Sequence, residues 1–292
     1  MDIYYIFFNP YSCSGTGKEK TYNLKNILTD VSLKYFDITK IENMQAFVDG
    51  LDDSIKIVIS GGDGTINNFI NTVDIDNLQN EIYCYSAGNG NDFLRDIGMY
   101  GKDEIVLINN YLRDLPVATI KGKTYKFLNN VSFGIDGYCC EVADEQRKKS
   151  NKKVNYSLIA IKGLLGGYKS KNATVTVDGV MKHYKRVWLS PVMNGRYIGG
   201  GLKIAPDQDR LNSESMVSFV VMHDLGRIKC LVNFPKLLTG EHVKLTDHVE
   251  VIKGHDITVC YDEPAPVQID GETIRNVLRY DVTSKCKSES KI

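Results

Sequence analysis

The sequence predicts an α/β fold in which an N-terminal Rossmann-like domain with a parallel sheet precedes a C-terminal, mainly antiparallel β-sandwich domain. Three observations predict it. Short apolar runs alternate with stretches of helical periodicity up to about residue 118. Three of these runs end in turns rich in Gly and Asn. Beyond residue 119 strand-like stretches dominate, and one helical stretch near residues 153–168 interrupts them.

The N-terminal alternation of strand and helix signals is typical of a parallel sheet with helices on its faces. The expected strands are residues 3–8, 34–39, 55–59 and 81–86. The expected helices are residues 18–33, 41–51 and 66–73, with a further helix around Phe93. Ligands of such sheets bind at the carboxyl ends of the strands, so the turns that follow the strands are the candidate sites.

The C-terminal part is typical of an antiparallel sandwich or barrel. Its expected strands are residues 124–133, 173–178, 184–193, 216–222, 248–252, 256–261 and 266–269. The predicted boundaries are 1–118 for the α/β domain and 119–276 for the β-rich domain. Residues 277–292 form a segment that could pack back on the first domain.

Composition excludes several classes of protein. The chain of 292 residues has 36 basic and 36 acidic residues, 42% apolar residues and 25% charged residues. These values exclude a disordered chain, a collagen-like fibre and a strongly basic nucleic-acid binder. No apolar run is long enough to span a bilayer, and the first residues lack the basic region of a signal peptide. Seven cysteines in a long chain favour reduced thiols in a cytoplasm.

The neutral total conceals an uneven distribution of charge. The net charge is −8 over residues 1–118, +7 over 119–175 and +1 over 176–292. A basic block without any acid comprises Arg147, Lys148, Lys149, Lys152, Lys153, Lys162, Lys169 and Lys171. Two interpretations stay open: a solvated helix face, or a surface that attracts phosphate groups, including those of anionic lipid. The apolar residues of 154–167 beside it fit either core packing or a membrane-facing segment.

Three strand-end turns are candidates for phosphate binding. The first turn, residues 9–18, departs from a Walker A loop but presents backbone N–H groups at a helix start. In the second, Gly61-Gly62-Asp63-Gly64-Thr65, the glycines allow close approach of a ligand to the backbone. The third, residues 87–95, repeats the pattern of small residues followed by an acid. Turns in successive strand-helix units converge on one crevice.

Asp63 needs an explanation, because a carboxylate repels phosphate. It could hold Mg²⁺ on a nucleotide, orient groups beside an acceptor hydroxyl, or simply cap a helix without any ligand. Near the other end of the chain, Asp270-Gly271-Glu272 follows an expected strand and projects acids from a tight turn. Such a carboxylate can accept a proton from a hydroxyl nucleophile, although an ordinary hairpin turn is the alternative.

The second turn, together with Gly88-Asn89-Gly90-Asn91-Asp92-Phe93, resembles the diacylglycerol kinase catalytic-domain family, which includes sphingosine, ceramide and bacterial lipid kinases. The resemblance extends in the family's order over nearly the whole chain. Its further elements are Asn9-Pro10 with Ser12, Gly15 and Gly17; Gly199-Gly200-Gly201 with Lys203 and Ala205-Pro206; and Asp270-Gly271-Glu272.

The resemblance implies an ATP-dependent lipid kinase with Mg²⁺ as a cofactor. It implies nucleotide contacts from Asn9, Pro10, Ser12, Thr39, Gly61, Gly62, Asp63, Gly64, Thr65, Asn67, Gly88, Asn89, Asn91 and Asp92. Asp63, Asp270 and Glu272 are the expected catalytic acids, and Asp63 is also a candidate ligand of the nucleotide-bound Mg²⁺. In this view the first domain binds the nucleotide and the β-rich domain binds the lipid.

The expected reaction moves the γ-phosphate of ATP to a lipid hydroxyl, with diacylglycerol giving phosphatidic acid as the first choice. The expected location is cytoplasmic, with peripheral association to the inner face of the membrane. The partners are ATP and lipid, without nucleic acid, and oligomerisation stays open. Two alternatives are a small-molecule kinase like the NAD kinases and a non-catalytic, nucleotide-gated lipid-binding protein.

Two departures from the family pattern bear on these expectations. Where the family often has an acid, in the strand near Val117, this chain has Ala118. Where bacterial members carry an Asp-Gly that holds a structural Mg²⁺, this chain has Leu211-Asn212-Ser213-Glu214-Ser215, and Asp207, Asp209 or Glu214 are the possible substitutes.

Overall fold

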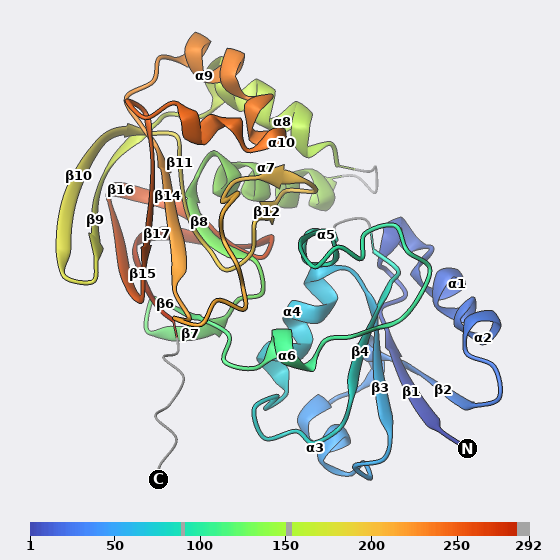
Figure 1. Cartoon of the computed structure of the whole chain (residues 1–292). Helices are drawn as coiled ribbons and strands as arrows, with labels where there is room; N and C mark the ends of the chain where they lie inside the picture. The colour runs from blue at the N-terminus through green and yellow to red at the C-terminus, as the bar shows by residue number, and fades with distance from the viewer. Residues whose placement is uncertain (89–90, 150–153, 285–292) are drawn as a thin grey trace, which may run out of the picture. The chain divides into compact units, whose positions relative to one another are not determined.

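The computed structural model describes residues 1–88, 91–149 and 154–284, and the chain divides into two compact units between Arg113 and Asp114 (Figure 1). The division precedes the expected boundary at residue 118, because β6 (Val117–Ile120) pairs with strands of the second unit. Within the described residues, no helix has the length and apolar character needed to cross a bilayer.

The first unit is built on a five-stranded sheet that is parallel except for one edge strand. Its spatial order is β2 (Ser32–Asp37), β1 (Ile3–Phe8), β3 (Lys56–Gly61), β4 (Ile82–Ser86) and the antiparallel β5 (Val106–Leu107). Ile6, Phe7 and Ile57 are fully buried, as expected for strands that are covered on both faces. Because β2 and β3 lie on opposite sides of β1, the strand order reverses between β1 and β3. The carboxyl ends of these two strands therefore flank the crevice where such sheets bind ligands.

Short helices connect these strands. They are α1 (Gly17–Tyr22), α2 (Leu24–Ile27), α3 (Met44–Asp49), α4 (Asp63–Thr72), α5 (Asp92–Asp96) and α6 (Asn109–Leu112), with 3-10 turns η1 (Cys13–Gly15) and η2 (Ile38–Lys40). In α4 the buried residues Ile66, Phe69 and Ile70 follow helical spacing. The single helix expected over residues 18–33 is wrong. Leu28 already has an extended backbone, and the chain enters β2 at Ser32.

The second unit is a ten-stranded sheet, antiparallel in every pair, which bears out the expected sandwich-like domain. Its main order is β15 (Val249–Gly254), β14 (Val217–Met222), β11 (Leu189–Met193), β8 (Asn130–Gly134), β16 (Asp256–Ile269), β17 (Glu272–Thr283), β6 and β7 (Lys123–Lys126). Beside β16 lie β9 (Lys171–Val177) and β10 (Val180–Val187), and β12 (Tyr197–Ile198) with β13 (Leu202–Lys203) forms a separate pair. Phe133, Phe219, Tyr261 and Tyr280 fill the core.

The long strand β16 replaces the two separate strands expected at residues 256–261 and 266–269. Irregular register between Cys260 and Val267 bends it, so that its first half pairs with β9 and its last residues pair with β8. Its partner β17 was not expected, because few of its residues are buried and the alternation is weak. Residues 277–283 therefore belong to the sheet of the second unit.

Helices gather at one end of this sheet (Figure 1). They are α7 (Ile135–Lys149), α8 (Tyr156–Lys162) with the π-turn η3 (Gly163–Gly167), α9 (Arg227–Asn233), α10 (Lys236–Thr239) and the 3-10 turn η4 (Glu241–Lys244). The stretch expected to be helical near residues 153–168 corresponds to α8 and η3. The longer α7 was not expected, because its second half is almost entirely polar. Leu164, Trp188, Cys230 and Leu237 share the core beneath these helices.

Candidate functional site

The turn after β1 is closed by its own side chains and bonded to the turn after β4. Asn9 accepts a hydrogen bond from the Tyr11 N–H through Oδ1 at 2.9 Å. The Ser12 hydroxyl lies 2.8 Å from the Asn9 carbonyl oxygen and 3.1 Å from that of Ala87. A Cβ on Gly17 would lie 2.1 Å from Ser12 Oγ and 2.6 Å from the Asn9 carbonyl oxygen, so the start of α1 can pack against this turn only with glycine at that position.

The turns after β3 and β4 are also in contact, and Asp63 joins them. Asp63 is the first residue of α4, but its carboxylate accepts from the N–H groups of Asp92 at 2.8 Å and Phe93 at 3.2 Å. It therefore caps the start of α5, a helix from the next strand-helix unit. A Cβ on Gly88 would lie 2.3 Å from Gly62 Cα, so the two backbones touch directly. The predicted convergence of the three turns is thus a geometric fact of the first unit.

Other residues expected at the nucleotide take supporting positions around these turns. The Asn91 amide donates to Ser86 Oγ at 2.9 Å and to the Gly88 carbonyl oxygen at 3.0 Å. Thr65 packs against Gly61, because a Cβ added to Gly61 would lie 2.3 Å from Thr65 Oγ1. Buried side chains in this group are Thr65, Asn67, Asn91 and Asp92. Pro10 lies in the first turn, and Asn89 lies outside the described residues.

Thr39 stands at the carboxyl end of β2, beside the first turn in strand order. Its N–H and its hydroxyl both donate to Asp37 Oδ1, at 3.0 and 2.7 Å. The side chain is exposed. The described contacts of Thr39 therefore close its own turn and do not join it to the other three.

The acidic residues of the described chain do not build a metal site by themselves. No group of three or more His, Cys, Asp and Glu side chains gathers within residues 1–88, 91–149 and 154–284. Both oxygens of Asp63 face backbone N–H groups. A Mg²⁺ ion that arrives on nucleotide phosphates needs only one or two carboxylates, so this arrangement fits a nucleotide-borne ion better than a resident one.

The stretch that stands in place of the family's metal-holding Asp-Gly is closed by the side-chain amide of Asn212. Asn212 donates through Nδ2 to the carbonyl oxygens of Asp209 at 2.6 Å and Met216 at 2.9 Å, and it accepts from Met216 N–H at 2.9 Å. Asp209 accepts from Leu211 N–H at 2.9 Å. These bonds close the turn with protein groups alone, and the residues present do not fit a metal-held turn.

Asp270 is bound by the backbone that leads into β8. Its carboxylate accepts three N–H groups, from Leu128 at 2.5 Å, Asn129 at 2.8 Å and Asn130 at 3.0 Å. The three donor residues are buried. Asp270 itself has a left-handed backbone with φ of 45°, a conformation that Asp tolerates better than most residues. The turn therefore holds Asp270 in one fixed place.

The same backbone segment receives two further side chains. Asn194 donates to the Leu128 carbonyl oxygen at 3.0 Å. Arg210 donates to that oxygen at 3.1 Å and to Asn129 Oδ1 at 3.1 Å. Sequence reasoning did not identify Asn194 or Arg210, because neither lies in a recognisable motif. Asn194, Arg210 and Asp270 therefore all bind polar groups of residues 128–130.

Asp136 is a partly buried acid that was not predicted from the sequence, in contrast to Asp63 and Asp270. It lies at the start of α7, and Gln268 donates to its Oδ2 at 3.2 Å. The side-chain oxygen Oε1 of Gln268 in turn accepts from Gly271 N–H at 2.9 Å, so Asp136 is connected to the Asp270-Gly271 turn. Burial raises the pKa of Asp136 to about 6, although hydrogen bonds from Ser132 and Gln268 act to lower it. The signal was present, since Gly134-Ile135-Asp136-Gly137 repeats the pattern of a strand followed by Gly and an acid.

The remaining expected residues differ in environment. Glu272 begins β17 with an exposed side chain. Ala118, which stands where the resemblance implies an acid, is fully buried in the apolar core of the second unit. The place of Ala118 is therefore a packing position in this chain.

Comparisons with known proteins cover both units. The diacylglycerol kinase catalytic domain matches residues 4–119, and the YegS C-terminal NAD kinase beta sandwich-like domain matches residues 129–282. A diacylglycerol kinase of Bacillus subtilis is 24% identical over 222 residues, which cover 74% of this chain and 70% of that protein. A putative lipid kinase of Staphylococcus haemolyticus is 28% identical over 249 residues, which cover 82% of this chain and 75% of that protein.

A solved structure supports the fold. The crystal structure of a diacylglycerol kinase from Bacillus anthracis superposes with a TM-score of 0.60 over 97% of this chain and 94% of that chain. The two sequences are 18% identical, so this likeness concerns the arrangement of the elements.

Proposed function

Because the chain belongs to the diacylglycerol kinase-like family that joins this catalytic domain to a YegS-type C-terminal domain, we propose that it is an ATP-dependent lipid kinase. It transfers the γ-phosphate of ATP to a lipid hydroxyl, and diacylglycerol is the first candidate, with phosphatidic acid as the product. The observation that carries the proposal is the contact between three glycine-rich turns at the strand-order reversal of the first unit.

The turns of the first unit bind the phosphates of the nucleotide through backbone N–H groups. The start of α4 offers such groups, and its dipole favours an anion. A Cβ on Gly64 would meet no atom of the described residues within 4 Å, so none of these residues requires glycine at this position. Close approach of a phosphate to the backbone supplies the requirement.

The variants Gly64→Ala and Gly88→Ala test this role. Gly64→Ala should leave the protein folded and weaken ATP binding, measured by calorimetry, because the new methyl group occupies the place of the ligand. Gly88→Ala should disturb folding first, because its Cβ would collide with Gly62. Wild-type ATP affinity in a folded Gly64→Ala protein would exclude phosphate contact at this turn.

A Mg²⁺ ion bound to the nucleotide would supply positive charge that offsets the charge of the phosphates during the transfer. Asp63 is placed to orient the turns, because its carboxylate holds α5 against the turn after β3. We propose that its part in metal binding is limited to the electrostatic field beside the phosphates.

In the second unit, the Asp270-Gly271-Glu272 turn supplies the carboxylate that accepts the proton of the lipid hydroxyl. Asp270 is the proposed acceptor, since three N–H donors fix its position, and Glu272 stands exposed at the beginning of the adjoining strand. Electrostatic positioning, rather than covalent chemistry, is the main source of rate in such transfers.

The direct test incubates the protein with γ-labelled ATP, Mg²⁺ and vesicles of mixed lipids. Label should appear in phosphatidic acid or another phospholipid. Label in NAD instead would favour the small-molecule kinase. ATP binding without any labelled product would favour a nucleotide-gated lipid-binding protein, the alternative that Ala118 motivates.

A further inference from the structure

We propose that the outward faces of α8, η3, α9 and α10 form a docking surface for a bilayer that contains anionic phospholipid. The inference rests on the proposed function, because a kinase that acts on a membrane lipid has to reach that lipid in the bilayer. We name this surface the helical cap. Its exposed apolar residues are Leu158, Ile161, Leu165, Ile228, Val232 and Leu238.

The helix α9 is apolar on both sides. Its inner residue Cys230 is buried in the core beneath the helices, with Leu231 packed against the same core. On the opposite side, Ile228 is 79% exposed and Val232 is 69% exposed, one helical turn apart. The outer side of α9 therefore presents two aliphatic side chains to the solvent, beside the exposed Lys229.

The neighbouring α8 and η3 repeat this arrangement. Ile159 and Leu164 are buried, while Leu158, Ile161 and Leu165 point outward, with Leu165 66% exposed. The inner residues of these helices share the cores to which α9 and α10 also contribute. The helices α8, α9 and α10 lie in one group (Figure 1), and the exposed side chains belong to this group.

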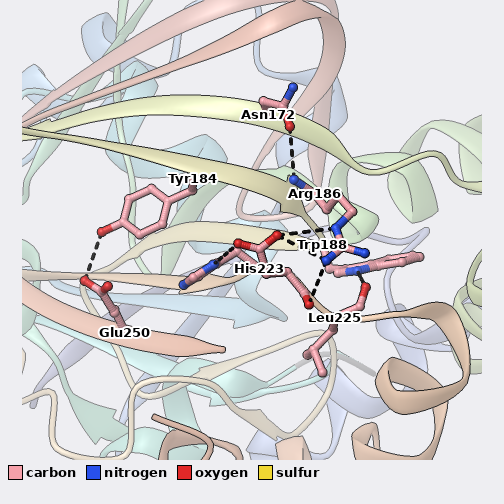
Figure 2. A network of polar contacts seen from close by, with 8 residues as sticks. Asn172, Tyr184, Arg186, Trp188, His223, Leu225 and Glu250 are labelled. Atoms are coloured by element: carbon pink, nitrogen blue, oxygen red, sulfur yellow. Dashed lines mark hydrogen bonds and ion pairs between the residues drawn. The ribbon is translucent and has the colours of Figure 1, made fainter. Parts of the chain in front are cut away.

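Polar contacts fix the helical cap on the sheet. Arg227, at the start of α9, donates to the Leu164 carbonyl oxygen at 3.2 Å, and its guanidinium lies 5.5 Å from the Trp188 ring centre. Figure 2 shows the loop that leads into α9, where Trp188 donates to the Leu225 carbonyl oxygen at 2.8 Å. Arg186 of β10 donates through Nε to Asp224 Oδ1 of that loop at 3.3 Å. The exposed apolar residues therefore stand on an anchored platform.

The charge of the helical cap selects the partner. Neither residues 154–169 nor residues 226–240 contain an acid. The same segments carry Lys162, Lys169, Arg227, Lys229 and Lys236. Cations beside exposed aliphatic side chains match an interface of anionic headgroups over hydrocarbon.

Two other partners fit less well. A second copy of this chain would bring the same five cations against the first set, and like charges repel. A nucleic acid would satisfy the cations but would leave aliphatic side chains uncovered, and Leu, Ile and Val offer no aromatic face for base stacking. The bilayer is the partner that satisfies both features.

The first experiment measures co-sedimentation with phosphatidylcholine vesicles, with and without phosphatidylglycerol. The double variant Ile228→Gln/Val232→Gln should bind anionic vesicles on the order of a hundredfold more weakly, roughly tenfold for each aliphatic side chain withdrawn from hydrocarbon. The matched control is Val180→Gln/Met181→Gln on β10, where the side chains are 66% and 61% exposed. This control should bind as the wild type does. Trp188 fluorescence verifies that each variant is folded.

The second experiment changes charge and salt. Lys162→Glu/Lys229→Glu should weaken binding to anionic vesicles on the order of a hundredfold and should hardly affect binding to neutral vesicles. Lys123→Glu, at an exposed position on β7, is the control. High salt should weaken wild-type binding, because charges on an exposed surface are screened.

The outcomes separate this inference from the proposed function. Wild-type vesicle binding by Ile228→Gln/Val232→Gln, or an equal loss in the control pair, would overturn it. A wild-type dimer that these substitutions dissociate, with vesicle binding unchanged, would also overturn it, because the helical cap would then join two copies. Variants that lose activity on vesicle diacylglycerol but keep activity on a monomeric short-chain diacylglycerol would support it. Vesicle binding without phosphorylation of any lipid would refute the proposed function and leave the docking surface standing.

Discussion

Removing the Asp270 carboxylate should destabilise the second unit, whatever its part in chemistry. Asp270→Ala leaves the N–H groups of Leu128, Asn129 and Asn130 without their acceptor, and these three residues are buried. An unpaired buried donor costs about 1–3 kcal/mol, so the lower bound for three is about 3 kcal/mol. Alanine in the left-handed conformation adds about 1 kcal/mol. We expect the free energy of unfolding to fall by about 4 kcal/mol.

The assay is urea unfolding followed by tryptophan fluorescence. Trp188 is the only tryptophan of the chain and is buried in the second unit, so its signal reports on that unit. With a slope of about 2 kcal/mol per molar urea, the midpoint should fall by about 2 M. Glu272→Ala, at an exposed position two residues away, should change the unfolding free energy by less than about 0.5 kcal/mol.

Two further substitutions separate the structural role of Asp270, as acceptor of three backbone hydrogen bonds, from its proposed role in the reaction. Asp270→Gly accepts the positive φ without strain, so a fall of about 3 kcal/mol there would isolate the lost hydrogen bonds. Asp270→Asn keeps Oδ1 for Asn129 and Asn130 but turns an amide N–H toward Leu128, which should cost about 1–2 kcal/mol. An inactive Asp270→Asn protein therefore identifies a proton acceptor only if its urea midpoint shows that it is still folded under the conditions of the activity assay. Urea midpoints equal to that of the wild type for both Asp270→Ala and Asp270→Gly would refute the stabilising role of these three hydrogen bonds.

Three other predictions concern groups whose contacts are equally specific. Asp63→Ala should lower the free energy of unfolding by about 1–2 kcal/mol, because it removes the carboxylate that accepts from the N–H groups of Asp92 and Phe93. Hydrogen exchange at these two amides should become faster. Unchanged exchange there would contradict the capping role of Asp63. Gly88→Ala should lower the melting temperature of the first unit, whereas Gly64→Ala should leave it unchanged. Equal melting temperatures of the two variants in calorimetry would show that the turns after β3 and β4 do not touch. Asp136 has a pKa raised to about 6, so the folded state binds more protons than the unfolded state between about pH 4 and pH 6, and stability should fall as pH rises through that window. Asp136→Asn should flatten this fall by about 1–3 kcal/mol, measured as urea midpoints across pH, and a parallel profile in the variant would exclude Asp136 as its cause.

The sequence predicted the elements that are buried on both faces. The aliphatic run of β3 and the helical spacing of Ile66, Phe69 and Ile70 left few alternatives, and both elements are found within a few residues of their expected bounds. The polar α7 and the half-exposed β17 were missed, because their stability comes from neighbours that are distant in sequence. Local pattern carries no information about such neighbours.

The candidate site divides in the same way. The three turns were predictable, because glycine beside an acid at a strand end is a strong local signal. The partners of the acids were not predictable. Asp63 binds residues about thirty positions away, and Asp270 binds residues about 140 positions away, so only the folded chain shows that both carboxylates hold backbone segments in place.

The bend in β16 has a consequence for how the second unit opens. One strand pairs with β9 in its first half, with β8 in its last residues and with β17 along its length. The part of the sheet that contains β9 therefore cannot separate from the part that contains β8 without breaking this strand. We expect the amides of β8, β9, β16 and β17 to form a single cooperative unit in native-state hydrogen exchange, protected until the whole unit unfolds, while the edge strand β7 exchanges through smaller openings.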